Sequence, residues 1–206
     1  MNKKPEIVYV VDDDEAVRDS LTWLLESNGY TVKCQPSAER FLQALQGDHK
    51  ETVSCLILDV RMPGMSGLEL QERLLAEGIP MPISFITGHG DVSMAVSTMK
   101  KGAVDFIEKP FKESELKVLV EKMLARARID YAKADTQKNT QNLLSKLTGR
   151  EKQVLERIVA GRLNKQIADD LNISIKTVEA HRANIMEKLN VNTVACLLYT
   201  SDAADE

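Results

Sequence analysis

Short apolar runs alternate with stretches of helical spacing along the first part of the chain. The runs lie at 7–11, 31–34, 55–58, 83–86 and 104–107. Those that begin at Ile7, Cys55 and Ile83 are nearly continuous in large apolar residues, which is typical of strands covered on both faces. Between the runs, apolar residues recur every three or four positions, as at 17–25, 38–45, 68–75 and 92–99. The alternation predicts an α/β fold, a doubly wound (βα)5 parallel sheet with right-handed crossovers.

A second pattern, helical throughout, begins at Leu143. A first helix follows the capping-box-like start Thr148-Gly149-Arg150-Glu151, and Gly161 ends it. A short helix at 165–171 and a longer one after Ser174 are joined by a turn of about three residues, the spacing of a helix-turn-helix. We therefore expect a small all-α domain there. Residues 133–142 have no aromatic and no large aliphatic side chain, so we expect a helical extension and linker at 126–144.

Polar residues stand where the predicted strands end. The first strand runs into Asp12-Asp13-Asp14, the third into Asp59, the fourth into Thr87, and the fifth leads to Lys109. In open parallel sheets, chemistry gathers beyond the carboxyl ends of the strands. Clustered carboxylates repel one another, and Mg²⁺ relieves this by binding one or two of them together with phosphate oxygens and water. The pattern therefore predicts a Mg²⁺ and phosphoryl site.

Asp59 is the candidate nucleophile of this site. It ends a central strand, and a carboxylate can form an aspartyl phosphate as a covalent intermediate. Lys109 supplies a fixed positive charge and Thr87 a hydroxyl for an incoming phosphoryl group. Any one of these acids could simply cap a helix, but Asp12, Asp13, Asp59, Thr87 and Lys109 together, at four strand ends, favour a site. No Gly-x-Gly-x-x-Gly follows the first strand, which disfavours dinucleotide binding.

The charge is unevenly distributed. The whole chain of 206 residues has a net charge of −4, which by itself argues against a nucleic-acid partner. Residues 143–192, however, carry nine basic and six acidic side chains. On the second helix of the predicted helix-turn-helix, polar and basic residues fall mostly away from the apolar stripe, as phosphate and major-groove contacts require. Charge alone leaves a protein-interaction domain as an open alternative.

Four segments resemble the receiver domain of two-component response regulators, most closely the FixJ type. They are VVDDD (10–14), LDVRMPGMSG (58–67), ITGHG (86–90) and DFIEKPF (105–111), and the resemblance covers about residues 5–125. It implies that Asp59 is the phospho-acceptor, with Thr87 and Lys109 contacting the phosphoryl oxygens. The metal set that it implies is Asp12, Asp13, Asp59 and the backbone carbonyl of Arg61. It also implies that Thr87 and Phe106 act as a switch, and that phosphorylation alters the face made by the fourth helix, fifth strand and fifth helix.

Three further segments look like the LuxR-type DNA-binding domain. They are LTGRE (147–151), NKQIA (164–168) and SIKTVEAHR (174–182), and the match spans about 145–198. The resemblance implies a four-helix module whose third helix enters the major groove and whose fourth helix pairs two copies. The candidate DNA contacts are Lys165, Lys176, Thr177, Val178, His181 and Arg182. We expect Glu179 to brace neighbouring Arg or Lys side chains. Residues 199–206 depart from the apolar periodicity of a fourth helix, so we expect a non-native or disordered tail there.

The combined prediction is a phosphorylation-dependent DNA-binding transcriptional regulator, not an enzyme. The expected partners are a sensor histidine kinase, double-stranded DNA, a second copy bound through the helix-four/strand-five face, and RNA polymerase. No apolar run approaches the ~20 residues of a membrane span, and three scattered cysteines favour a reduced, cytoplasmic setting. Two alternatives remain, an aspartate-nucleophile phosphatase and a phosphorelay adaptor with a protein-binding helical domain. The phosphatase is disfavoured because Arg61 stands where such enzymes place a second acid.

Overall fold

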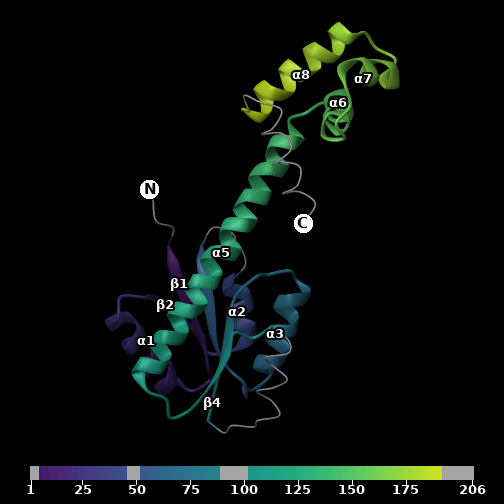
Figure 1. The fold of residues 1–206 in the computed structure, drawn as a ribbon. Helices are drawn as coiled ribbons and strands as arrows, with labels where there is room; N and C mark the ends of the chain where they lie inside the picture. The colour runs from purple at the N-terminus through teal and green to yellow at the C-terminus, as the bar shows by residue number, and fades with distance from the viewer. Residues whose placement is uncertain (1–4, 46–51, 89–101, 192–206) are drawn as a thin grey trace. The chain divides into compact units, whose positions relative to one another are not determined.

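The computed structural model describes residues 5–45, 52–88 and 102–191 (Figure 1). The chain divides into two compact units, Met1–Tyr131 and Ala132–Glu206. The predicted helix at 92–99, the predicted pairing helix that starts near Thr193 and the predicted tail at 199–206 lie outside the described residues. No helix among the described residues combines the length and apolar character needed to cross a bilayer.

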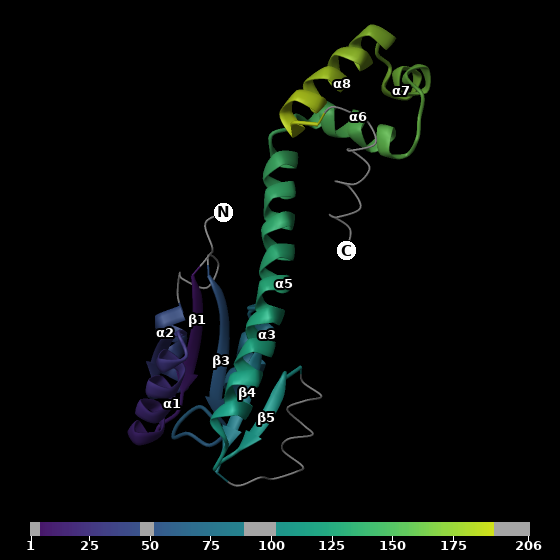
Figure 2. The ribbon, with the colours of Figure 1, turned by 60° about the vertical axis from the view of Figure 1, so that its left-hand side comes forward.

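The first unit is built on a parallel sheet of five strands. These are β1 (Glu6–Val11), β2 (Thr31–Gln35), β3 (Val53–Asp59), β4 (Ile83–Thr87) and β5 (Asp105–Glu108). Their order is β2-β1-β3-β4-β5, and every neighbouring pair is parallel. Figure 2 shows β1, β3, β4 and β5 following one another in this order. Val11 pairs with Leu58, and Asp59 pairs with Ile86. This register brings the carboxyl ends of β1, β3 and β4 to one edge, which is the edge that the sequence predicted to be functional.

Helices cover both faces of this sheet. On one face, α2 (Ala38–Leu45) and α3 (Gly67–Ala76) bury Phe41 and Leu70 against the strands. On the other face, α1 (Glu15–Ser27) and the first part of α5 (Glu113–Ser145) bury Leu21 and Val120. Every residue of β3 is buried, as expected for a central strand with helices on both sides. The predicted doubly wound α/β fold is confirmed.

The segment predicted as helical extension and linker lies within a single helix. Helix α5 runs from Glu113 to Ser145 without a break. Residues 112–146 contain neither glycine nor proline, so nothing in the sequence interrupts the helix. The side chains of residues 132–139 are all exposed. Residues 132–139 therefore contribute no core, whereas Ala127, Leu143 and Leu144, nearer the two ends of the predicted segment, pack against the cores.

The second unit contains three further helices around a small core. They are α6 (Gly149–Val159), α7 (Asn164–Leu171) and α8 (Ile175–Leu189). Their shared core includes Val154, Ile158, Ile167, Val178 and Ile185. The predicted capping box of the first helix is present, because Thr148 and Glu151 each accept the other's backbone N–H. The turn between α7 and α8 contains Asn172 in the left-handed conformation and ends at Ser174, which caps α8.

Candidate functional site

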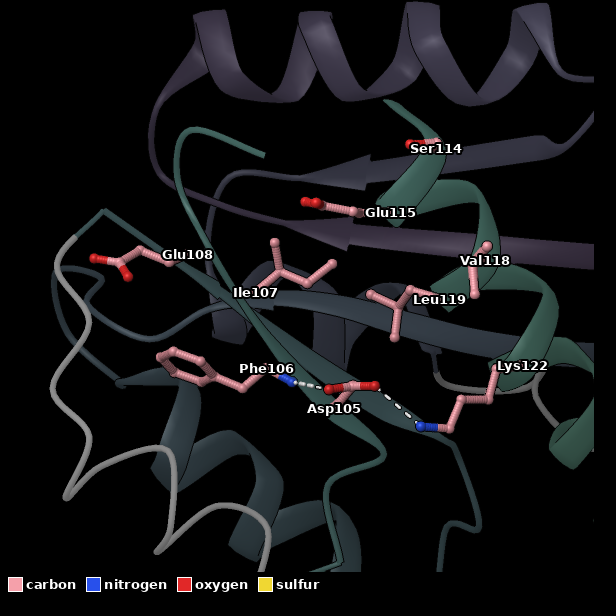
Figure 3. A pocket seen from close by; sticks show the side chains of 9 residues that line it. All are labelled: Asp105, Phe106, Ile107, Glu108, Ser114, Glu115, Val118, Leu119 and Lys122. Atoms are coloured by element: carbon pink, nitrogen blue, oxygen red, sulfur yellow. Dashed lines mark hydrogen bonds and ion pairs between the residues drawn. The ribbon is translucent and has the colours of Figure 1, made fainter. Parts of the chain in front are cut away.

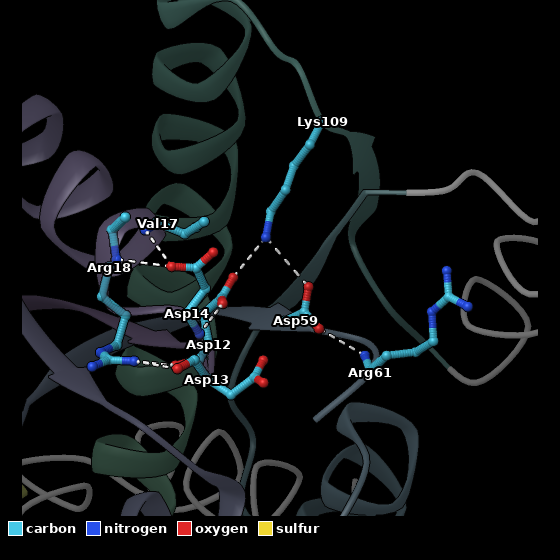
Figure 4. Close-up of polar contacts among 9 residues, drawn as sticks. Asp12, Asp13, Asp14, Val17, Arg18, Asp59, Arg61 and Lys109 are labelled. Atoms are coloured by element: carbon cyan, nitrogen blue, oxygen red, sulfur yellow. Dashed lines mark hydrogen bonds and ion pairs between the residues drawn. The ribbon is translucent and has the colours of Figure 1, made fainter. Parts of the chain in front are cut away.

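Two buried carboxylates and one ammonium group meet at the carboxyl edge of the sheet. Asp12 directly follows β1 and is 3% exposed, and Asp59 ends β3 and is 9% exposed. The Lys109 Nζ lies 2.8 Å from Asp12 Oδ2 and 3.4 Å from Asp59 Oδ1 (Figure 4). Lys109 directly follows β5, so three strands supply the three charges. The predicted convergence of Asp12, Asp59 and Lys109 is therefore present in the structure.

The backbone around Asp59 leaves no room for a side chain at Gly67. A Cβ atom at Gly67 would lie 2.2 Å from the carbonyl oxygen of Asp59, far inside van der Waals contact. The Gly67 amide also donates to the carbonyl of Val60 at 3.0 Å. Helix α3 starts at Gly67, so only a glycine lets this helix begin directly against the end of β3. This close approach fixes the position of the loop that follows Asp59.

Burial raises the pKa of Asp59. Loss of solvent is the largest cause, and the nearby negative charge of Asp12 adds to it. The positive charge of Lys109 and the Arg61 amide, which donates to Asp59 Oδ2 at 2.7 Å, act in the opposite direction and do not outweigh them. A group with a raised pKa is harder to ionise. Additional positive charge at this edge would therefore favour the nucleophilic carboxylate form of Asp59.

Lys109 keeps its charge in this setting. Burial is the largest single influence and would lower the pKa of Lys109. The hydrogen bond and charge of Asp12, together with the charge of Asp59, outweigh burial and raise this pKa above its ordinary value. Lys109 therefore stays protonated and offers a fixed cation to an incoming anion.

The acidic loop after β1 is held by hydrogen bonds that the sequence did not reveal. The Arg18 guanidinium donates through one nitrogen to the carbonyls of Asp12 and Asp13, each at 2.9 Å. The Asp14 amide donates to Asp12 Oδ1 at 2.9 Å, and the Asp14 side chain caps α1. The Asp13 side chain is exposed beside this buried cluster (Figure 4). A basic residue one turn into the helix after an acidic loop was the only available sequence signal for this arrangement.

The donor set suits a hard cation. Carboxylate and carbonyl oxygens are the ligands that Mg²⁺ prefers, and Mg²⁺ commonly keeps several waters and uses only one or two carboxylates. Among the described residues, no three His, Cys, Asp or Glu side chains are arranged as a complete metal site. Arg61 shows only its amide contact with Asp59, so the role of its carbonyl stays a prediction.

Thr87 and Phe106 lie on neighbouring strands beside this cluster. Thr87 ends β4 and is 3% exposed, and its carbonyl accepts the Lys109 amide at 2.7 Å. Phe106 lies in β5, is half-buried and packs against one face of the sheet core. Beyond it, β5 and the start of α5 line a shallow pocket (Figure 3) that includes Phe106, Ile107, Val118 and Lys122. Of the three elements in the predicted switch face, β5 and α5 are described and the fourth helix is not.

The predicted DNA contacts fall into three groups in the structure. Lys165, Lys176 and Thr177 are exposed at the starts of α7 and α8, whereas His181 and Arg182 are half-buried. Val178 is fully buried in the core of the second unit, so its inclusion among the DNA contacts was wrong. It lies on the apolar stripe of α8 and cannot reach a base from there.

The expectation for Glu179 stays a prediction. Glu179 is exposed and makes no ion pair with any residue in the described parts of the chain. Ala180 and Ala183 are exposed on the same helix and were not singled out from the sequence. Each of these alanines lies three or four residues along the helix from another exposed residue, and this spacing was the sequence signal that could have identified them.

An ion pair between a half-buried lysine and a buried carboxylate joins α8 to α6. Glu151 is 3% exposed, and the Lys188 Nζ donates to both of its carboxylate oxygens, at 2.9 and 2.7 Å. The Lys188 hydrogen bonds, followed by the Thr148 amide, lower the pKa of Glu151 to about 2. The carboxylate that closes the α6 capping box therefore also fixes the far end of α8. Nothing in the sequence pattern indicated this pair.

Two family models match the chain. The model described as "Response regulator receiver domain" matches residues 8–121, and the model described as "Bacterial regulatory proteins, luxR family" matches residues 145–198. FixJ of Bradyrhizobium diazoefficiens, a transcriptional regulatory protein, is 42% identical over 93% of this chain and 92% of its own length. The response regulator TodT of Pseudomonas putida is 42% identical over 98% of this chain and 88% of its own length.

Solved structures give the same result. The response regulator StyR superimposes with a TM-score of 0.85 and 46% identity, covering 97% of this chain and 99% of its own. Full-length FixJ from B. japonicum gives a TM-score of 0.58 and 41% identity, covering 99% and 98%. Together with the acidic edge of the sheet and the three-helix unit, these matches show that the chain belongs to the two-component response regulators that join a receiver domain to a LuxR-type DNA-binding domain.

Proposed function

We propose that Asp59 is the phospho-acceptor of this phosphorylation-dependent DNA-binding transcriptional regulator, and that a sensor histidine kinase is its donor. The observation that carries the proposal is the placement of Lys109 between Asp12 and Asp59 at the carboxyl edge of the sheet. This arrangement combines a nucleophile with a fixed cation, the two groups that phosphoryl transfer to a carboxylate needs.

In the proposed reaction, a carboxylate oxygen of Asp59 attacks the phosphorus atom and the donor histidine leaves. Mg²⁺, held by Asp12, Asp13, Asp59 and the Arg61 carbonyl, would supply positive charge to the acidic cluster and the phosphoryl oxygens. Lys109 is already protonated at this position, so it can contact a phosphoryl oxygen without a change of protonation state. The Arg61 amide holds the second oxygen of Asp59 and leaves the first directed toward Lys109.

The switch would proceed from the site along β4 and β5. A phosphoryl group on Asp59 attracts the Thr87 hydroxyl, and Phe106 follows inward on the neighbouring strand. The altered face then favours a dimer through the fourth helix and β5 by shifting an existing equilibrium. Such a dimer presents two copies of α8 about one DNA turn, ~34 Å, apart on a two-fold site. RNA polymerase is the proposed recipient of the signal. The proposed cellular location of the protein is the cytoplasm.

DNA binding rests on the exposed cations near the two helix starts. Lys165 and Lys176 are exposed and form no ion pair within the described residues, so both are available to phosphate oxygens. Thr177 adds a hydroxyl, and the half-buried His181 and Arg182 flank the groove-facing surface. A phosphorelay adaptor would instead bind protein with this unit and would ignore DNA.

The test compares Asp59→Asn with Asp19→Asn. Both changes remove one negative charge, but Asp19 is exposed on α1 and is not among the contacts of Asp59 and Lys109. Each protein is treated with Mg²⁺ and acetyl phosphate and analysed by intact mass and by light scattering after gel filtration. We expect the parent and Asp19→Asn to gain one phosphoryl group and a dimer, and Asp59→Asn to gain neither. Equal phosphoryl uptake by Asp59→Asn would show that another residue is the acceptor.

A further inference from the structure

A stripe of exposed residues runs along one side of α8. Lys176, Glu179, Ala180, Ala183 and Glu187 are all exposed and follow one another at intervals of one to four residues, the spacing of a single helix face. The opposite side of α8, at Val178, Ile185 and Leu189, is buried in the core. This stripe and the neighbouring exposed residues Thr177 and Asn184 make up the side of α8 that is free of core contacts and can face the major groove.

Two positions on the stripe are alanines. Ala180 and Ala183 are exposed and extend no more than a methyl group from the helix. Short side chains let a helix backbone approach the floor of the groove closely. A methyl group also matches the C5-methyl of thymine, the one apolar group that a base edge presents in the major groove.

Glu179 is the unusual member of the stripe. It is the fifth residue of α8, in the part of a recognition helix whose side chains reach base edges. Its carboxylate has neither an ion pair nor a hydrogen bond to any described residue, whereas the second carboxylate on this helix face, Glu187, lies two turns further on.

A carboxylate brought into the groove loses water and faces the negative potential of the phosphates. It is tolerated there only if a donor replaces the lost hydrogen bonds. In the major groove, the amino groups of cytosine and adenine are the donors, and Glu pairs characteristically with the N4 amino group of cytosine.

We propose, resting on the proposed role of α8 in DNA binding, that Glu179 determines sequence specificity by accepting a hydrogen bond from the N4 amino group of an operator cytosine. Ala180 and Ala183 contact the neighbouring bases and favour thymine. Lys165 and Lys176 supply affinity without sequence information, because their partners are phosphates.

The test is binding-site selection from random duplexes with full-length protein activated by beryllofluoride. Glu179→Gln is compared with the parent and with Glu156→Gln, a matched control that makes the same chemical change at an exposed position of α6, outside the stripe. We expect the parent and the control to select one sequence with a fixed cytosine. Glu179→Gln should lose that preference by roughly 5- to 150-fold and shift it toward adenine, the base that a Gln amide pairs with best.

The outcomes separate the two proposals. If the parent selects a sequence and Glu179→Gln selects the same one, the role of Glu179 is wrong while DNA binding by α8 stands. If the parent selects no sequence and its DNA affinity does not respond to salt, the DNA-binding role of α8 fails and the inference fails with it. Glu179 is exposed and unpaired among the described residues, so an unchanged circular dichroism spectrum is expected for the variant.

Discussion

At the scale of single residues, the site depends on one position that has no functional group. Gly67 allows α3 to begin against the carbonyl of Asp59, and any side chain there must displace backbone atoms because the nearest contact is a main-chain oxygen. Asp59, the proposed nucleophile, is thus positioned by the absence of a Cβ atom at Gly67 as much as by its charged neighbours.

Gly67→Ala should destabilise the receiver domain by roughly 1–3 kcal/mol, the cost of overpacking a close contact. Gly149→Ala is the matched control, because Gly149 also stands at the first position of a helix and a Cβ there meets nothing within 4 Å. The control should be neutral or stabilising by about 0.4–1 kcal/mol. Urea denaturation measures both changes. Equal free energies of unfolding for the two variants would mean that the loop after Asp59 moves at no cost to make room for the added methyl group.

The sequence predicted the positions of some site residues and not of others. Asp12, Asp59 and Lys109 were predictable because each directly follows or ends a strand, and parallel strands bring such positions to one edge. Arg18 was not, since its partners are backbone carbonyls, which no side-chain pattern reveals. The error at Val178 arose because the resemblance to LuxR-type domains was applied to a whole segment, although the apolar spacing of α8 already placed this residue inward.

At the scale of elements, the second unit contains an ion pair, with a buried carboxylate and a half-buried lysine, that joins helices far apart in the chain. Glu151 and Lys188 are separated by 37 positions, and their contact depends on how α6 and α8 cross. Helical periodicity sets which face of each helix is buried but not the relative axial shift of two helices. The sequence therefore predicted three helices here and could not predict the pair.

The pair gives the second unit a defined acid sensitivity. The pKa of Glu151 is about 2 in the folded protein against 4.5 for the free group. The contribution of this carboxylate to the stability of the second unit is therefore complete above about pH 4.5 and is lost as the pH falls toward 2. Glu151→Gln should therefore unfold more easily than the parent near neutral pH, and the difference should shrink through that window. Glu156→Gln, an exposed change on the same helix, should show no such trend. Denaturant titrations at several pH values measure the differences, and a gap that does not depend on pH would contradict the pair's role.

At the scale of the whole molecule, the distribution of charge matters more than its total. The net charge of −4 hides a second unit whose exposed cations are free of ion pairs within the described residues. Binding to DNA should release one condensed counterion for about each phosphate that these cations contact.

Lys165→Gln and Lys176→Gln should each reduce the slope of log affinity against log salt by about 1, and should weaken binding similarly on all sequences. Lys117→Gln, an exposed change on the receiver part of α5, removes the same charge and should leave the slope unchanged. Fluorescence anisotropy with a labelled duplex over a range of salt gives the three slopes. A slope equal to the parent's in both test variants would exclude these two lysines as phosphate contacts.

Helix α5 has a consequence for local motion. Residues 132–139 lie in its middle with every side chain exposed. Among the described residues, these turns are held by main-chain hydrogen bonds and by short-range side-chain contacts such as Thr136 Oγ1 to the Ala132 carbonyl. Opening them breaks no core contact, whereas opening the part that carries Val120 and Met123 does. Hydrogen–deuterium exchange should therefore divide this one continuous helix, with fast-exchanging amides at 134–139 and slow ones at 117–127. A protease should cut first in the same place and release each unit still folded.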